Sequence, residues 1–305
     1  MHQEAAASDG RDSPCRLGSG GEEAHSRVPA LQAKEAEVDE AVSLLKVRGR
    51  PVGHIHDRRE YWMRNFIPDA YVRGILTEGY RIPVEWEEIP ESYEEPDNKS
   101  AKEHYGFVRE EVKRLVETGR VVEWPCRPRC TNPLTVAMKF RDDGSIQKRL
   151  VLDLSRCVNL PLASDNFRMV TLQDAINATR EGSYQLVFDL KSAFHHICLH
   201  SSCYELMGFK VDREDGQVVY YCFVVLVFGL KVASQVLGRV LKPLCVFLIQ
   251  NGVPVIVYID DSLVVGPSKE KAERRFMLAL DVLGKAGFLV SLEKSSRPVH
   301  SIPWG

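Results

Sequence analysis

Apolar and polar positions along this chain repeat with two different periods, one typical of strands and one typical of helices. The strand period is clearest from Val255 to Val265, where two β-branched runs flank the acidic pair Asp260-Asp261. Such runs predict a β-hairpin with the acidic pair at its tip. Tyr184 to Asp189 predicts a further strand, and Val218 to Val227 predicts a fully buried one.

The helical period dominates the segments between these strands. Apolar residues recur at helical spacing from Ser234 to Ile249, where Pro243 predicts a bend. Ser268 predicts the N-cap of a helix that continues to Lys285. Further helices are expected at Val108–Thr118, at Ala36–Lys46, and from the capping box of Thr171 and Asp174 to Ala178.

The order of strand, helix, strand hairpin and helix predicts an α+β fold, with a sheet covered on one side by helices. Residues 1–35 are rich in Ala, Gly, Ser and Glu, and we expect them to be disordered. Residues 36–100 form an N-terminal extension. Within it, residues 55–85 carry enough aromatic side chains to dock on another surface, and residues 86–100 form an acidic strap or linker.

The acidic pair carries the candidate chemistry. Adjacent carboxylates between buried strands repel each other and lose hydration unless a cation compensates them. Asp189 ends the upstream strand, so three carboxylates meet at one edge if the two strands are neighbours in one sheet. A two-metal phosphoryl-transfer site has this composition, with ions about 4 Å apart. The alternative interpretation of the acidic pair is an Asp-Asp turn on an ordinary surface hairpin.

Five segments, in order along the chain, resemble those of reverse transcriptases, most closely the polymerases of DIRS-like retrotransposons. Tyr258 to Asp261 resembles the Tyr-x-Asp-Asp motif of that family, and Asp189 to Ile197 resembles its first catalytic motif. The other matching segments are Lys139–Asn159, Phe228–Lys231, and Ala286–Phe288 together with Glu293–Ser295. The resemblance covers the chain from about Ala101 to its C-terminus.

The resemblance implies an RNA-directed DNA polymerase of the right-hand type, with fingers at residues 101–170 and a palm, an antiparallel sheet covered by helices, at residues 171–305. Two Mg²⁺ ions, for which Mn²⁺ can substitute, would be held by Asp189, Asp260 and Asp261, with the carbonyl of Leu190 as a further ligand. Neighbouring strand residues face opposite ways, so we expect Asp260 to act more directly than Asp261. The partners implied are an RNA template, a DNA primer and deoxynucleoside triphosphates.

The resemblance also assigns side chains to the incoming nucleotide. Those expected to grip the triphosphate are Lys139 and Arg149, with Lys148 as a rival to Arg149. Phe228 and Gly229 are expected to line the nucleotide pocket. Phe194 is expected to exclude a 2′-hydroxyl, and Lys294 is expected to protonate pyrophosphate. The alternatives are a core position for Phe194 and an ordinary surface position for Lys294.

Some positions depart from the family pattern. Val227 and Ser234 stand where the family has proline, and Ser262 stands where it has glycine. Ser301–Gly305 resembles the start of a primer grip, so we expect a chain without thumb or ribonuclease H segment, which a longer polyprotein would supply. The alternative function is an inactive remnant that binds nucleic acid without synthesis. A palm polymerase that makes RNA fits less well, because an aromatic gate at Phe194 would reject ribonucleotides.

Charge is distributed unevenly along the 305 residues, although the net charge is only −2. Residues 1–100 hold 13 basic and 20 acidic side chains, whereas residues 101–305 hold 27 basic and 22 acidic ones. The part that carries the motifs is therefore the basic part, which suits a phosphate-backbone partner. Without a signal peptide or membrane-spanning run, the eight scattered cysteines predict free thiols in an intracellular compartment, either cytoplasm or nucleus.

Overall fold

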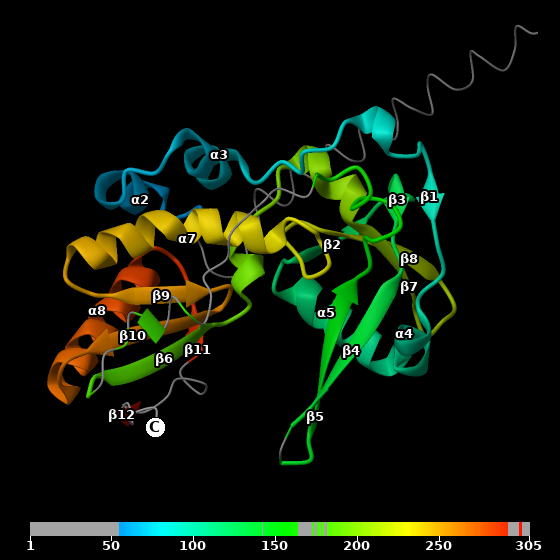
Figure 1. Cartoon of the computed structure of the whole chain (residues 1–305). Coiled ribbons are helices and arrows are strands. Elements are labelled where there is room, and N and C mark those ends of the chain that lie inside the picture. Colours follow the sequence, from blue (N-terminus) through cyan, green and yellow to red (C-terminus); the bar gives the residue numbers. More distant parts are fainter. Residues whose placement is uncertain are drawn as a thin grey trace, which may run out of the picture.

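The computed structural model describes residues 55–141, 143–163, 173, 176, 177, 179, 182–291, 299 and 300, and these form an α+β fold (Figure 1). The predicted fold class is therefore confirmed. The expectations for residues 1–35, for Ala36–Lys46, for the capping box of Thr171 and Asp174, for Lys294 and for Ser301–Gly305 lie outside the described residues.

One sheet carries the candidate chemistry and is called the Asp189 sheet here. Its strand order is β11 (Val290–Ser291), β6 (Tyr184–Leu190), β10 (Asp261–Gly266) and β9 (Val255–Tyr258), and all neighbours are antiparallel. The short strand β12 (Val299–His300) also pairs with β6. The predicted hairpin and the predicted strand before Asp189 are both confirmed, and they are neighbours as the convergence of the carboxylates requires.

Two long helices pack against the Asp189 sheet, α7 (Ala233–Gln250) against β9 and α8 (Lys269–Lys285) against β6 and β10. Both helices were predicted from the sequence. The Ser268 hydroxyl accepts the Lys271 N–H at the start of α8 and so caps it, as expected. Phe276 of α8 meets Phe188 of β6 edge to face, with ring centroids 5.8 Å apart, and this contact joins helix and sheet.

A second sheet has the order β1 (Tyr93–Glu94), β3 (Cys130–Thr131), β7 (Gly208–Asp212), β8 (Val218–Phe223) and β2 (Val121–Trp124). The predicted strand Val218–Val227 is too long, and its prediction as fully buried is wrong, since the strand ends at Phe223 and Val218 is 45% exposed. The next four residues are buried in a connection between the sheets, where Leu226 N–H donates to the Ile197 carbonyl. A run of apolar residues indicates burial, but it does not indicate the residue at which a strand ends.

A long hairpin of β4 (Leu134–Phe140) and β5 (Ile146–Leu152) projects from the molecule (Figure 1). Beside it lie α4 (Lys99–Glu103) and α5 (Tyr105–Glu117). The predicted helix at Val108–Thr118 is confirmed as α5, although it begins three residues earlier. The 3₁₀ helices η2 (Ala193–His196) and η3 (Ser201–Met207) follow β6.

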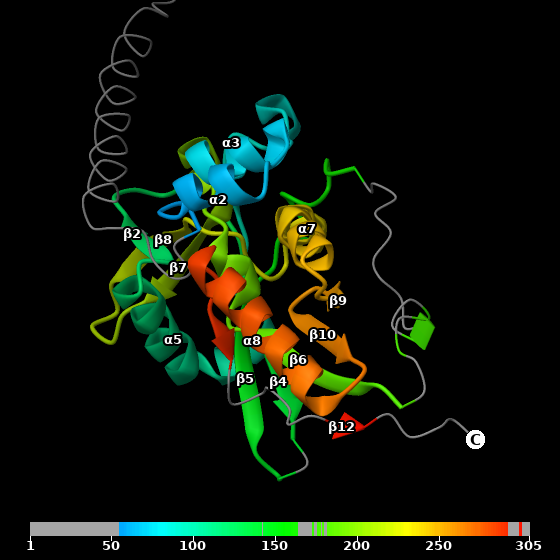
Figure 2. The same ribbon diagram turned by 90° about the vertical axis from the view of Figure 1, so that its left-hand side faces the viewer.

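The N-terminal part of the described chain docks on the helices of the Asp189 sheet. It forms α2 (Arg59–Asn65), α3 (Ala70–Glu78) and η1 (Trp86–Glu88), and α2 and α3 lie on the opposite side of the molecule from the tip of the β4–β5 hairpin (Figures 1 and 2). Phe66 meets Phe247 of α7 edge to face at 5.2 Å. The aromatic residues of the predicted docking segment therefore find their partner within the same chain.

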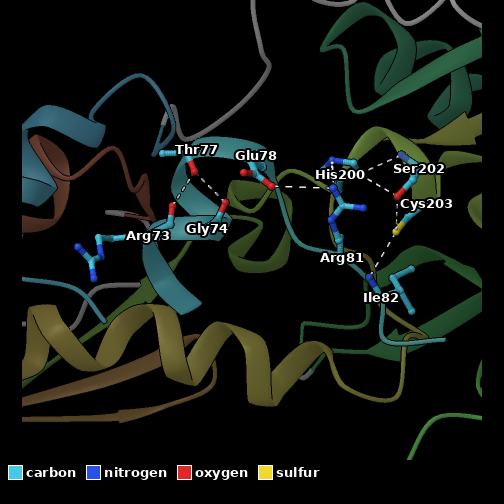
Figure 3. A network of polar contacts seen from close by, with 9 residues as sticks. All are labelled: Arg73, Gly74, Thr77, Glu78, Arg81, Ile82, His200, Ser202 and Cys203. Carbon is cyan, nitrogen blue, oxygen red and sulfur yellow. Dashed lines mark hydrogen bonds and ion pairs between the residues drawn. The ribbon is translucent and has the colours of Figure 1, made fainter. Parts of the chain in front are cut away.

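A polar network fastens the end of α3 to η3 (Figure 3). Glu78 forms an ion pair with Arg81 at 3.9 Å, and an Arg81 guanidinium nitrogen lies 2.7 Å from His200 Nε2. The backbone N–H of Ile82 donates to Cys203 Sγ at 3.3 Å. These contacts hold the N-terminal segment against the stretch that follows Asp189.

In the part of the chain that the structure describes, no helix is both long enough and apolar enough to span a bilayer.

Candidate active site

The acidic residues lie where β6 and β10 run side by side. Asp261 is the first residue of β10 and pairs with Asp189 of β6. Asp260 lies in the turn before β10, and its carbonyl accepts the Leu190 N–H at 2.9 Å. The turn is tight because Ile259 adopts a left-handed conformation, with φ of 58°. Backbone pairing therefore holds the two segments that carry these carboxylates in fixed register.

A cavity of about 630 Å³ opens between the Asp189 sheet and the β4–β5 hairpin. Asp189 and Asp260 both line it, whereas Asp261 does not. Asp189 is only 7% exposed, so its carboxylate is largely withdrawn from bulk water. The other residues relevant to the candidate chemistry that line the cavity are Glu111, Arg114, Arg120, Arg141, Gln147, Lys148, Arg149, Leu190, Lys191, Ala193, His195, Phe223, Val227 and Phe228.

The carboxylates offer hard oxygen ligands of the kind that Mg²⁺ prefers. Across the described ranges, no three His, Cys, Asp or Glu side chains are close enough together to hold a metal ion. The expected convergence is thus present in the backbone pairing but is not a closed cage of three carboxylates. The donor set fits a divalent cation in its chemistry.

The β4–β5 register separates the two rival residues of the hairpin. Ala137 pairs with Arg149 and Met138 pairs with Lys148, so Arg149 and Lys148 lie on opposite faces. The Arg149 guanidinium carbon lies 4.6 Å from the ring centroid of Phe228. Lys148 Nζ instead lies 3.4 Å from His104 Nδ1, and 6.0 Å from the ring centroid of Phe107. Both residues line the cavity, and Arg149 is the one that stacks on Phe228 in the cavity wall.

Lys139 lies further along the hairpin, opposite Gln147. Gln147 is two residues from Arg149 on β5 and so points to the same face of the hairpin. Lys139 shares that face because it is the paired residue of Gln147. It is exposed and does not line the cavity, whereas Arg141 and Gln147 of the same hairpin do.

Phe194 and Phe228 form an aromatic pair behind Arg149. Their ring centroids are 4.7 Å apart in an edge-to-face arrangement. Phe228 lines the cavity, whereas Phe194 is 5% exposed and does not. Phe194 therefore supports Phe228 from within the core, and its assignment as a gate for the sugar stays a prediction.

Gly229 lies at a very close approach between two backbone segments. Its φ is +107°, and a Cβ at this position would lie 2.0 Å from the Leu152 carbonyl oxygen. Asn159 fixes the same loop, since its Nδ2 donates to the Gly229 carbonyl at 2.7 Å and its Oδ1 accepts the Lys231 N–H at 2.9 Å. Only glycine combines this conformation with this contact. Asn159 lies in one of the segments that resemble reverse transcriptases, but nothing in the sequence indicated that its side chain would bond both ends of this loop.

Sequence reasoning also missed basic residues of the cavity wall. Arg120 is 4% exposed, and burial together with the nearby charge of Arg114 lowers its pKa to about 10. Burial, followed by repulsion from Arg120, lowers the pKa of His195 to about 3. The excess of basic residues in the segment 101–305 was the one available signal, and it did not show which of them would be buried.

A protein-family model described as "Reverse transcriptase (RNA-dependent DNA polymerase)" matches residues 128–303, more than half of the chain. The Gag-Pol polyprotein of Gibbon ape leukemia virus is 27% identical over 204 residues, which are 66% of this chain and 12% of that protein. A putative enzymatic polyprotein of Cassava vein mosaic virus is 23% identical over 212 residues, which are 68% of this chain and 29% of that protein. The chain thus spans less than a third of the length of each relative.

Solved structures with a similar fold include the protease-reverse transcriptase of prototype foamy virus, with a TM-score of 0.54 at 19% identity, over 82% of this chain and 34% of that one. The foamy viral protease-reverse transcriptase in complex with double-stranded DNA gives a TM-score of 0.55 at 18% identity, over 80% of this chain and 44% of that one. At this level of identity the likeness concerns the fold alone.

Proposed function

The chain belongs to the reverse transcriptase (RNA-dependent DNA polymerase) family, and we propose that its cavity is the active site of an RNA-directed DNA polymerase. The reaction would join a deoxynucleoside triphosphate to the 3′-hydroxyl of a DNA primer on an RNA template and release pyrophosphate. One observation carries this proposal: Asp189 and Asp260 line the same cavity as Arg149 and Phe228.

Asp189, Asp260 and Asp261 would hold two Mg²⁺ ions, or Mn²⁺ in their place, with the Leu190 carbonyl as a further ligand. When bound, such ions activate the attacking hydroxyl and stabilise the leaving pyrophosphate. Asp260 lines the cavity and Asp261 does not, which supports a more direct role for Asp260.

The side chains opposite the carboxylates suit a nucleotide. Arg149 can donate two hydrogen bonds to phosphate oxygens, and its stacking on Phe228 limits the orientations of its guanidinium. Lys139 would add a point charge when the exposed hairpin approaches the ligand. Phe194, by holding Phe228, would set the wall against which the sugar lies and so act against a 2′-hydroxyl. Lys294 would protonate the pyrophosphate.

In this proposal the β4–β5 hairpin with α4 and α5 forms the fingers, and the Asp189 sheet with α7 and α8 forms the palm. The partners would be an RNA template and a DNA primer. The two viral relatives are polyproteins several times longer than the matched segment. A retrotransposon polyprotein, as the DIRS-like motifs suggest, would supply further polymerase segments.

Primer extension tests the proposal directly. The assay uses poly(rA)/oligo(dT), dTTP and Mg²⁺, and it compares the wild type with Asp260→Asn and with Asp281→Asn as a matched control on the outer face of α8. We expect incorporation by the wild type and the control, and a loss of at least about 100-fold in Asp260→Asn. Salt-sensitive duplex binding by all three proteins without any incorporation would overturn the catalytic proposal and favour a nucleic-acid-binding protein.

A further inference from the structure

Arg120 is a buried cation in the wall of the cavity. It follows α5 and Gly119 directly, and its backbone is fixed on both sides, because its N–H donates to the Leu115 carbonyl at 2.9 Å and its carbonyl accepts the Val224 N–H at 3.1 Å. The side chain is 4% exposed and yet lines the cavity. Its position is therefore set by the junction of α5 with the second sheet.

The surroundings of Arg120 do not neutralise its charge. Its Nε is buried and has no hydrogen-bond partner among the described residues. The nearby charges are Arg114, which repels it, and Glu111, which attracts it. Glu111 is already bonded by Arg114, whose Nε donates to the carboxylate at 2.7 Å. Burying a cation without a paired anion is costly, so the missing counter-charge needs an explanation.

The cavity as a whole carries an excess of positive groups. Its basic lining residues are Arg114, Arg120, Arg141, Lys148, Arg149 and Lys191. Its acidic lining residues are Glu111, Asp189 and Asp260. His195 adds no positive charge at neutral pH, because burial and Arg120 keep its pKa at about 3. A ligand with several negative charges would balance this wall.

We infer that Arg120 and Arg114 form an anion site in the cavity wall, which takes a phosphate-type anion such as pyrophosphate or the polyphosphate tail of a nucleotide. This site is separate from the phosphate contacts expected of Lys139 and Arg149. It extends the proposed polymerase function, and only the identity of its natural ligand rests on that function. Two guanidinium groups can bind several phosphate oxygens at once, and the burial of Arg120 strengthens the hydrogen bonds that it donates.

Pyrophosphate binding without metal tests the site separately from catalysis. Isothermal titration with sodium pyrophosphate in EDTA compares the wild type with Arg120→Met, which keeps an unbranched side chain about as long as the aliphatic part of arginine and removes the charge. We expect at least a tenfold loss of affinity in Arg120→Met and no change in Arg73→Met, which replaces an exposed arginine of α3. Arg114→Gln is a second variant, because its partly exposed side chain carries less risk to folding, and it should lose about fivefold or more. Wild-type affinity in both cavity variants would overturn the inference.

Thermal unfolding without ligand separates a ligand-binding arginine from a structural one. If Arg120 awaits an anion, Arg120→Met should unfold at the same temperature as the wild type or higher, and pyrophosphate should stabilise the wild type alone. A lower unfolding temperature in Arg120→Met, together with unchanged stabilisation by pyrophosphate, would assign Arg120 a structural role and overturn the site.

Two further comparisons identify the source of the anion and keep the two proposals apart. Competition by tripolyphosphate and dTTP, but not by thymidine, is expected for a site that reads phosphate alone, and competition by thymidine would overturn it. Asp189→Asn should lose primer extension and still bind pyrophosphate. Primer extension by Asp189→Asn would count against the catalytic proposal. The anion site would still be tested separately by pyrophosphate binding to Arg120→Met.

Discussion

Asp189 lies directly opposite Asp261 in the antiparallel pairing of β6 with β10. The residue before Asp261 is tied to the same strand, because the Leu190 N–H donates to the Asp260 carbonyl. The pairing of two backbones thus holds three carboxylates at one sheet edge, although their side chains do not close around a common point. Carboxylates this close in the backbone pairing repel each other, and a divalent cation bound between them would relieve that repulsion.

The first prediction concerns metal binding by this acidic edge. Mg²⁺ or Mn²⁺ should stabilise the wild type, by about 1.4 kcal/mol in free energy of unfolding when the metal concentration is ten times its Kd. Asp189→Asn should lose most of this stabilisation and, in EDTA, be at least as stable as the wild type, because one repelling charge is gone. Urea unfolding with and without metal measures both effects, with Asp281→Asn as the control. Equal metal stabilisation of Asp189→Asn and wild type would contradict the metal assignment.

The elements around this edge could be predicted because each has a local signal. The β-branched runs around Asp260-Asp261 predicted β9 and β10, and Ser268 predicted the start of α8. The register of Asp189 with Asp261 could not be read from the sequence, since a strand sequence does not specify its partner residue. Only the paired sheet sets this relationship.

The site residues that were missed depend on contacts between distant segments. Arg120 looks like any surface arginine after a helix, and its burial follows from the pairing of β2 with β8 one hundred residues later in the chain. The pair of loop hydrogen bonds formed by Asn159 requires the close approach of Gly229 to Leu152. Tertiary packing decides both, so a period or a propensity could not reveal them.

The second prediction separates Arg149 from Lys148. Arg149→Ala should raise the KM for dTTP at least about tenfold, because it removes a bidentate phosphate donor and the contact with Phe228. Lys148→Ala should change KM by less than about threefold, because the Lys148 Nζ lies beside His104 and Phe107, on the opposite face of the hairpin from Arg149, although Lys148 also lines the cavity. Steady-state incorporation kinetics on the same template provide the test. The reverse order of effects would assign the triphosphate contact to Lys148.

The third prediction concerns the N-terminal segment as a support for β6, the strand that carries Asp189. Trp62 is fully buried, and its Nε1–H donates to the Ala286 carbonyl at 2.9 Å. Its ring lies 6.3 Å from Phe288, which in turn lies 5.0 Å from His196, and His196 Nε2 lies 3.0 Å from the Lys191 carbonyl oxygen. These contacts lead from α2 to the residues that follow Asp189.

Trp62→Phe should lower the free energy of unfolding by about 1–3 kcal/mol, because a buried carbonyl loses its donor. The substitution should lower kcat for nucleotide incorporation more than it changes KM, because it disturbs the support of Asp189 and leaves the nucleotide contacts in place. The control is Trp86→Phe, at a part-exposed tryptophan of η1, where less than about 0.5 kcal/mol is expected. Chemical denaturation and steady-state kinetics give the two measurements, and an unchanged kcat in a destabilised Trp62→Phe would remove this supporting role.

The fourth prediction follows from the lowered pKa of His195. Its folded-state pKa is about 3 against an ordinary value of 6.5, chiefly because of burial and then because Arg120 and His196 disfavour a further positive charge. Above pH 6.5 the ring is neutral in both the folded and the unfolded chain, so it makes no pH-dependent contribution. Between pH 6.5 and 3 the unfolded chain binds a proton that the folded chain does not, so stability falls as pH falls, with a slope approaching about 1.4 kcal/mol per pH unit.

His195→Gln cannot take up this proton, and its loss of stability from pH 7.5 to pH 5 should therefore be smaller than that of the wild type by about 1–2 kcal/mol. Urea unfolding at pH 7.5, 6 and 5 measures the difference, and any loss of packing caused by the substitution is already present at pH 7.5. Parallel stability profiles of the two proteins would show that His195 takes up protons in the folded chain and that its surroundings, Arg120 included, do not repel positive charge as the buried site requires.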